Sequence, residues 1–234
     1  MTNETLLLCG TAASIGFFHT LMGPDHYLPF IALAKTNNWS KVKTFWVTII
    51  CGIGHVLSSV ILGFIGIGFG VALFKLEAIE SFRGDLAMWF LLTFGFVYFI
   101  WGIFHAIKNK PHSHFHKHED GETHAHEHKH AVNHIHPHKS KNKSIVWGLF
   151  IIFIFGPCEP LIPLIMFPAA KGSMVSVMLV ATIFAMVTIG TMLSVVMLSL
   201  SGLNLFQTKA ISRYSHAFAG FIVFCCGGAI YFGL

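Results

Sequence analysis

Charged side chains are scarce in this sequence, and their scarcity indicates the class of protein. Only 11% of the 234 residues are Asp, Glu, Lys or Arg, against roughly 25% in ordinary soluble domains. By contrast, 54% of the residues are hydrophobic. A soluble chain of this length could not bury so much apolar surface, so lipid is its expected solvent. The modest net charge of +5 comes mostly from connecting segments, and we expect no nucleic-acid partner.

Paired cysteine motifs are missing as well. The five cysteines show no CxxC spacing, which argues against a disulfide framework and against a zinc ribbon. A cleavable signal peptide is not expected either, because the first apolar run follows MTNET without a basic leader and continues into further membrane segments.

Long apolar runs are what the sequence has instead. Each reaches the roughly 20 residues that a helix needs to cross the hydrocarbon core, so we predict an all-α, polytopic protein with six transmembrane helices. The predicted spans are Leu6–Ala34, Thr44–Phe74, Leu86–Ile107, Ser144–Ala170, Ser173–Leu200 and Tyr214–Leu234.

The basic residues predict an orientation. Twelve of the fifteen lie at one set of span ends and in the long third loop, while only Lys75, Arg83 and Lys171 lie at the other ends. The positive-inside rule then predicts a multi-pass protein of the inner (plasma) membrane, with both termini outside and the long loop in the cytoplasm.

That loop, residues 108–143, is a break in composition. It is too polar to pack a core, so we expect it to be disordered without a ligand. Its alternating histidines are typical of tracts that bind metal through interchangeable imidazoles. We predict metal buffering or delivery, with a solvated tether as the alternative. The loop histidines are His112, His114, His116, His118, His124, His126, His128, His130, His134, His136 and His138.

The two halves around the loop repeat one another. A Gly-Pro pair occurs at 23–24 in the first span and at 156–157 in the fourth, and GFVYFIWG from Gly95 aligns with GFIVFCCG from Gly220. Each half has three predicted spans, an odd number, so the second half is inverted. Inverted repeats with broken helices are typical of secondary transporters. We therefore predict a first repeat over 1–107, the His-rich loop over 108–143, and a second repeat over 144–234.

The first span places ionisable groups deep in apolar sequence. His19, Asp25 and His26 would be costly in lipid unless they met a partner or a substrate. On an unbroken helix His19 and His26 would lie roughly 10 Å apart along the axis. Gly23 and Pro24 should break the helix and let the two histidines approach each other.

The fourth and second spans supply further candidates. Glu159 follows Cys158, and Pro157 and Pro160 should break this helix near Gly156. The glutamate could bind metal or carry a coupling proton, and the cysteine is either a ligand or inert. His55 in the second span is a candidate further ligand, with interhelical hydrogen bonding as the alternative. Imidazole, carboxylate and thiolate together suit Ni, Co, Zn or Cu better than Mg or Ca.

These motifs resemble those of a known group. HTLMGPDHYLPF resembles the histidine signature of nickel/cobalt transporters, and is closest to the variant of the urease-accessory-type membrane proteins in the lysine-exporter-like superfamily. GIGHVLSS resembles the second signature segment of that group, and GPCEPLIPL resembles its matching motif in the fourth span. The resemblance implies metal-site roles for His19, Asp25, His26 and His55. One departure is the five residues between the first His and the Asp-His pair, where many nickel/cobalt permeases have four.

The sequence thus predicts a non-enzymatic permease for a divalent transition-metal cation. Ni²⁺ or Co²⁺ would be the substrate, with Zn²⁺ as an alternative, and the direction is left open. We expect no organic cofactor. The expected partners are the bilayer, the ion, and a cytoplasmic metallochaperone or metalloenzyme maturation protein, while the oligomeric state is open. The alternatives are a small-anion (sulfite-like) exporter, a metal-storage or chaperone-docking protein, and a membrane thiol–disulfide transfer protein. The last would need paired cysteines at the two breaks, where Cys158 is matched by Asp25.

Overall fold

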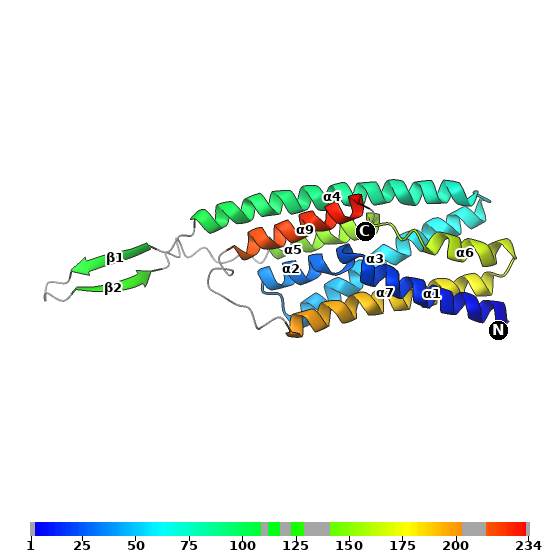
Figure 1. The fold of residues 1–234 in the computed structure, drawn as a ribbon, viewed down its shortest axis with the longest axis horizontal. Helices are drawn as coiled ribbons and strands as arrows, with labels where there is room; N and C mark the ends of the chain where they lie inside the picture. Colours follow the sequence, from blue (N-terminus) through cyan, green and yellow to red (C-terminus); the bar gives the residue numbers. More distant parts are fainter. Residues whose placement is uncertain (1–2, 109–111, 118–122, 129–140, 203–213, 233–234) are drawn as a thin grey trace.

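The chain folds into an elongated bundle of helices whose axes run roughly along one direction (Figure 1). The computed structural model describes residues 3–108, 112–117, 123–128, 141–202 and 214–232. Its helical elements are α1 (Asn3–Met22), η1 (Pro24–His26), α2 (Leu28–Thr36), α3 (Lys41–Gly68), α4 (Leu73–Lys108), α5 (Lys141–Phe155), α6 (Leu161–Ala170), α7 (Met174–Gly202) and α9 (Ser215–Tyr231).

Length and composition confirm a multi-pass membrane protein. Within the described residues, α1, α3, α4 and α7 are each long and apolar enough to cross a membrane. The helices α5, α6 and α9 are apolar but shorter. Large apolar side chains such as Phe18, Trp46 and Phe104 are exposed on the outside of the bundle, where lipid would cover them.

The two predicted helix breaks are present. Pro24 has no N–H to donate, so the first α-helix ends at Met22 and a single 3₁₀ turn, η1, leads into α2. In the second half, α5 ends at Phe155 and α6 begins only at Leu161, with Pro157 and Pro160 in the segment between them. Each of these predicted spans is therefore two α-helices, joined by the 3₁₀ turn η1 in the first half and by residues 156–160 in the second.

Helix α4, which contains the predicted third span, is longer than the sequence predicted. The predicted second and third spans end at Phe74 and begin at Leu86, whereas α3 ends at Gly68 and α4 already begins at Leu73. The predicted span begins after Glu80 and Arg83, whose charges disfavour a membrane helix when each is considered alone. Inside the bundle these two side chains form an ion pair. The helix can therefore include both residues without burying an unpaired charge.

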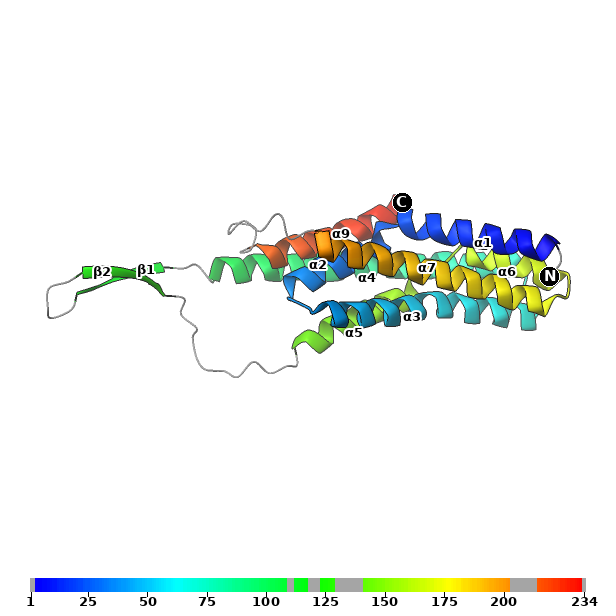
Figure 2. The same ribbon diagram turned by 90° about the horizontal axis from the view of Figure 1, so that it is seen from below.

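Glycines bring α4 and α9 into backbone contact in a reciprocal pattern. A Cβ on Gly95 would collide with the backbone of Phe224, and a Cβ on Gly220 would collide with the backbone of Phe99. Phe99 lies four residues after Gly95, and Phe224 lies four residues after Gly220. The contact is thus the same on both helices, as small residues at helix–helix interfaces in lipid allow. Both views show the two helices side by side (Figures 1 and 2).

Part of the His-rich segment differs from expectation. The sequence predicted no regular structure between 108 and 143, but β1 (His112–Lys117) and β2 (Thr123–His128) pair as an antiparallel hairpin. In its register His112, His114 and His116 lie opposite His128, His126 and His124. The side chains of the loop histidines lie outside the described part of the chain.

Candidate functional site

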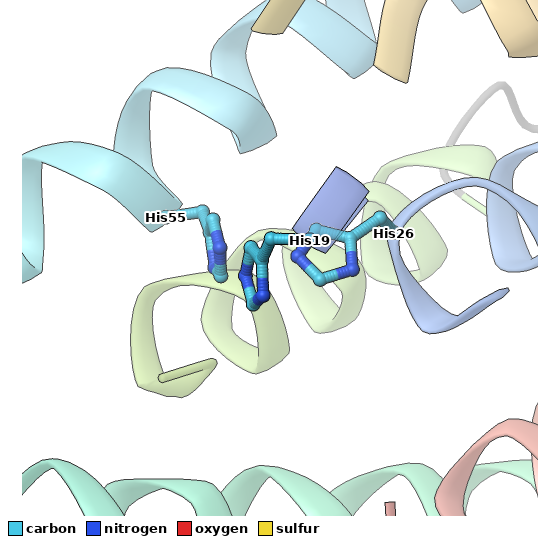
Figure 3. A group of neighbouring side chains, drawn as sticks. All are labelled: His19, His26 and His55. Atoms are coloured by element: carbon cyan, nitrogen blue, oxygen red, sulfur yellow. The ribbon is translucent and has the colours of Figure 1, made fainter. Parts of the chain in front are cut away.

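Three histidines from different elements meet at the first helix break. His19 lies in the last turn of α1, His26 in η1 and His55 in the middle of α3. One ligand nitrogen from each lies within 4.8 Å of the others, and the three imidazoles point toward one another (Figure 3). A shift of less than about 1 Å per ring would bring all three nitrogens to the bond length of a bound transition metal.

The imidazole nitrogens of this cluster lack the partners that buried polar atoms normally have. Nε2 of His19, Nε2 of His26 and both ring nitrogens of His55 are buried without a hydrogen-bond partner among the described residues. An unsatisfied buried polar atom costs free energy, and native structures contain few of them. Four such atoms in one cluster make it a candidate ligand site.

Asp25 orients one of these rings. Nδ1 of His26 lies 3.2 Å from Oδ1 of Asp25 and 3.2 Å from the carbonyl oxygen of Gly23. A carboxylate or carbonyl partner on one nitrogen fixes the tautomer and leaves the other nitrogen for a metal ion. The sequence predicted both His26 and Asp25 as metal ligands; in the structure Asp25 lies against Nδ1 of His26, where it can hold the ring.

Both helix breaks contact this cluster through a glycine. A Cβ on Gly23 would lie 2.6 Å from Nδ1 of His26, and a Cβ on Gly156 would lie 2.9 Å from Nδ1 of His55. A small cavity joins the two breaks and is lined by Asp25, His55, Gly156, Pro157 and Ile230, among others. The space between the breaks is thus a single site shared by the two halves.

Two predicted ligands do not join the histidines. Glu159 is exposed, and Cys158, although fully buried, contributes no atom to the cluster of close ligand atoms within the described residues. Cys158 packs instead in an apolar cluster that contains Val56, Leu161 and Val180. The structure therefore brings together His19, Asp25, His26 and His55, and separates Glu159 and Cys158 from them.

An ion pair that the sequence analysis missed supports the second break. Glu80 is fully buried, and it accepts hydrogen bonds from the Cys158 backbone N–H at 3.1 Å and from the Ser59 hydroxyl at 3.1 Å. Arg83 pairs with Glu80 and donates to Ser58 Oγ at 2.6 Å and to the Ile154 carbonyl at 2.7 Å. The pair thereby satisfies backbone groups that the break leaves without helical partners. The available signal was the opposite charges at i and i+3 directly before an apolar run.

A thiol also lies at the first break. Sγ of Cys226, on α9, is 3.9 Å from the carbonyl oxygen of Pro24. Cys158 lies in the second break itself, so each break has a cysteine beside it. All five cysteines of the chain are free thiols, and Cys158 and Cys226 are both buried.

The comparisons with known proteins give one family. The model of the cytochrome C biogenesis protein transmembrane region matches residues 28–229. No curated protein and no solved structure matches the chain significantly. The match contains His55, Glu80, Arg83, Cys158 and Cys226, and it begins just after His19, Asp25 and His26.

This match corrects the family and function that the motifs predicted. The resemblance to nickel/cobalt transporters and to urease-accessory-type membrane proteins is wrong, and so is the transition-metal permease function drawn from it. The three short motifs reflect histidines placed near a helix break, and another family can share that feature. Since the match spans most of the 234 residues, the chain belongs to the family of the cytochrome c biogenesis protein transmembrane region.

Proposed function

We propose that this protein transfers reducing equivalents across the membrane by thiol–disulfide exchange in support of cytochrome c biogenesis. The observation that carries the proposal is the presence of one buried thiol at each helix break, Cys158 at the second and Cys226 at the first. Family membership supplies the process, and the two thiols supply the chemistry. The cysteines come from non-corresponding helices, which is why alignment of the two halves alone did not pair them.

The cavity between the breaks offers a route between the two thiols. Pro157 and Ile230 both line it. Cys158 follows Pro157 in the chain, and Cys226 lies one helical turn before Ile230 on the same face of α9. Exchange between the two thiols would require the backbone at the breaks to rearrange.

The proposed reaction exchanges the two thiols of Cys158 and Cys226 for one disulfide of a partner protein. The thiolate of one cysteine attacks a disulfide of a partner protein, and the partner's S–S bond breaks as a mixed disulfide forms. The second cysteine attacks the mixed disulfide and releases the partner as a dithiol. The partner gains two electrons and two protons, and the chain keeps a Cys158–Cys226 disulfide. A dithiol protein on the other side of the membrane reduces that disulfide by the same exchange.

A bound transition-metal ion is the second part of the proposal. The four unpartnered nitrogens of His19, His26 and His55 favour an ion held in place rather than an empty polar cluster. Imidazole ligands suit Zn, Cu, Fe or Ni. Such an ion would link α1, η1 and α3. It would also keep the two breaks, and with them the two thiols, separated until a partner disulfide binds. Glu159 and the loop histidines are not needed for this role.

The arrangement of helices supports the predicted inverted repeat. We infer that α1 with α2, α3 and α4 correspond to α5 with α6, α7 and α9. The α1 helix packs on α7 as α5 packs on α3, and α2 packs on α9 as α6 packs on α4. The reciprocal Gly95 and Gly220 contacts follow the same symmetry. We keep repeats over 1–107 and 144–234, with 108–143 between them.

The distribution of charge supports the predicted orientation. Lys35, Lys41 and Lys108 lie at helix ends on the side of the His-rich segment. Arg83 is paired inside the bundle, so it no longer counts among the basic residues of the opposite side. We propose that segment 108–143 faces the cytoplasm and that the N-terminal end of α1 faces away from it.

The proposal can be tested in cells that lack the gene. Haem staining of c-type cytochromes should decrease in such cells, and the wild-type gene should restore it. Cys158→Ser and Cys226→Ser should each fail to restore it. Cys51→Ser is the matched control because Cys51 is also a buried thiol in an apolar helix, but it lies at neither break. Normal cytochrome c content in the deletion strain, or full activity of both serine variants, would refute the proposal.

A further inference from the structure

A pair of histidines, separate from the cluster of three at the helix breaks, lies far along the bundle from them. His105 is in the last turn of α4, and His216 is in the first turn of α9. Gly102 allows this approach, because a Cβ there would collide with the backbone of Ala217. The α4 and α9 ends that carry the pair lie at the same end of the bundle, next to the start of the His-rich segment (Figure 1).

The spacing of the two rings fits a shared metal ion. The ring centroids of His105 and His216 are 5.5 Å apart, and the planes are nearly perpendicular at 85°. In the cluster at the breaks the corresponding separations are 4.8 Å and 5.0 Å. With metal–nitrogen bonds of about 2.1 Å, two imidazoles on one ion place their ring centres roughly 4.5–6 Å apart.

A hydrogen-bond chain fixes the His216 ring. Nδ1 of His216 lies 2.8 Å from the Tyr98 hydroxyl, and the side-chain amide of Asn37 donates to the same hydroxyl at 3.3 Å. A hydrogen bond on one ring nitrogen orients metal-binding histidines. Because Nδ1 is engaged by Tyr98, Nε2 is the His216 nitrogen left for a metal ion, and binding there requires the tautomer in which Nδ1–H donates to the Tyr98 oxygen.

Trp101 covers both rings. It stacks on His105 with centroids 5.1 Å apart and 20° between the planes, and it meets the edge of His216 at 5.1 Å. The indole holds the two imidazoles in place and gives an optical probe within a few ångströms of both. His105 is exposed and His216 is half-buried, so an ion can reach the pair from the aqueous side.

We propose that His105 and His216 form a second transition-metal site, at the end of the bundle where the His-rich segment begins. The pair binds an imidazole-seeking ion of the Cu²⁺, Ni²⁺ or Zn²⁺ class, with water completing the coordination. Tyr98 and Asn37 are positioning residues, and Trp101 is the wall of the site. This site is independent of the thiol chemistry at the breaks, and each could be present without the other.

The test is a Cu²⁺ titration of the tryptophan fluorescence of the full chain in detergent. Bound Cu²⁺ should quench Trp101 in a saturable step, and Trp101→Phe should remove that step. His105→Ala and His216→Ala should remove it too, while Trp89→Phe and His19→Ala should leave it intact. Trp89 is an exposed tryptophan on the same helix, and His19 belongs to the cluster at the breaks.

Tyr98→Phe keeps the aromatic ring and removes the hydrogen bond to His216. It should weaken Cu²⁺ binding in this step by about 10- to 100-fold, even if an alanine variant fails to fold. An unchanged Trp101 step in His105→Ala and His216→Ala would mean that copper on the loop histidines quenches at a distance, and would overturn the proposal. An unchanged affinity in folded Tyr98→Phe would overturn the positioning role.

Discussion

Gly156 and His55 are in direct contact, with the Cβ position of Gly156 only 2.9 Å from Nδ1 of the imidazole. The residue that opens the second helix break therefore sets the space for a histidine at the centre of the first half. Because Gly23 has the same relationship to His26, the histidine cluster and the two breaks form one unit. A substitution at either break should therefore alter the geometry of the histidine cluster.

The first prediction concerns this contact. Gly156→Ala should lower transition-metal affinity at the cluster by about tenfold or more, since the methyl group would displace the His55 ring. Isothermal titration of Ni²⁺ or Zn²⁺ into the purified protein measures the effect. Gly190→Ala is the control because a Cβ there meets nothing within 4 Å. Equal affinities in the two variants would contradict the contact.

The second prediction concerns the orientation of His26. Asp25→Asn should weaken metal binding by about 10- to 100-fold, because the amide is a weaker partner for Nδ1–H than the carboxylate at 3.2 Å. Asp85→Asn removes a charge from an exposed position on α4 and should leave binding unchanged. The same titration reports both, and an Asp25→Asn variant with wild-type affinity would exclude the orienting role.

The third prediction concerns the buried ion pair. Arg83→Met leaves the Glu80 carboxylate buried without its cation, and breaking a pair in this way costs about 3–5 kcal/mol. The double variant Glu80→Met with Arg83→Met removes both charges, and it should recover part of that loss. The half-life at elevated temperature in detergent is the measurement. A double variant that is less stable than Arg83→Met would contradict this account.

The fourth prediction concerns the α4–α9 interface. Gly95→Leu and Gly220→Leu should each separate the helices and reduce the yield of folded protein, because a side chain would collide with the facing backbone. Gly228→Leu on α9 should have little effect, since a Cβ there meets nothing within 4 Å. Size-exclusion chromatography of the detergent-solubilised variants distinguishes the cases.

Much of the fold follows from local sequence physics, and the remainder depends on packing. Pro24 and Pro157 break helices by their own covalent structure, so both breaks and the meeting of His19 with His26 could be predicted. Arg83 could not be placed correctly, because its charge counts against a membrane span until its partner Glu80 is seen. Cys226 lies 202 positions after Pro24, and no periodicity in the sequence predicts that contact. The resemblance to nickel/cobalt transporters depended most on the motif around residues 19–26, which precedes the matched region.

The fifth prediction links the two kinds of site. A metal ion on His19, His26 and His55 should slow alkylation of Cys226, since this thiol lies against the same break at Pro24. The rate of maleimide labelling, measured by mass spectrometry with and without Zn²⁺, should fall with metal in the wild type and stay constant in His55→Ala. Exposed Cys225 provides the internal control. Equal metal protection of both thiols would mean that the ion acts elsewhere.

The most direct test of the central claim is the redox state of Cys158 and Cys226 in growing cells. Thiols are trapped with acid and alkylated, and the peptides are then analysed without reduction. The account predicts a fraction of protein with a Cys158–Cys226 disulfide, and mixed disulfides with partner proteins when either cysteine is replaced by serine. Finding both cysteines fully reduced in every strain, with no mixed disulfide in either serine variant, would contradict it.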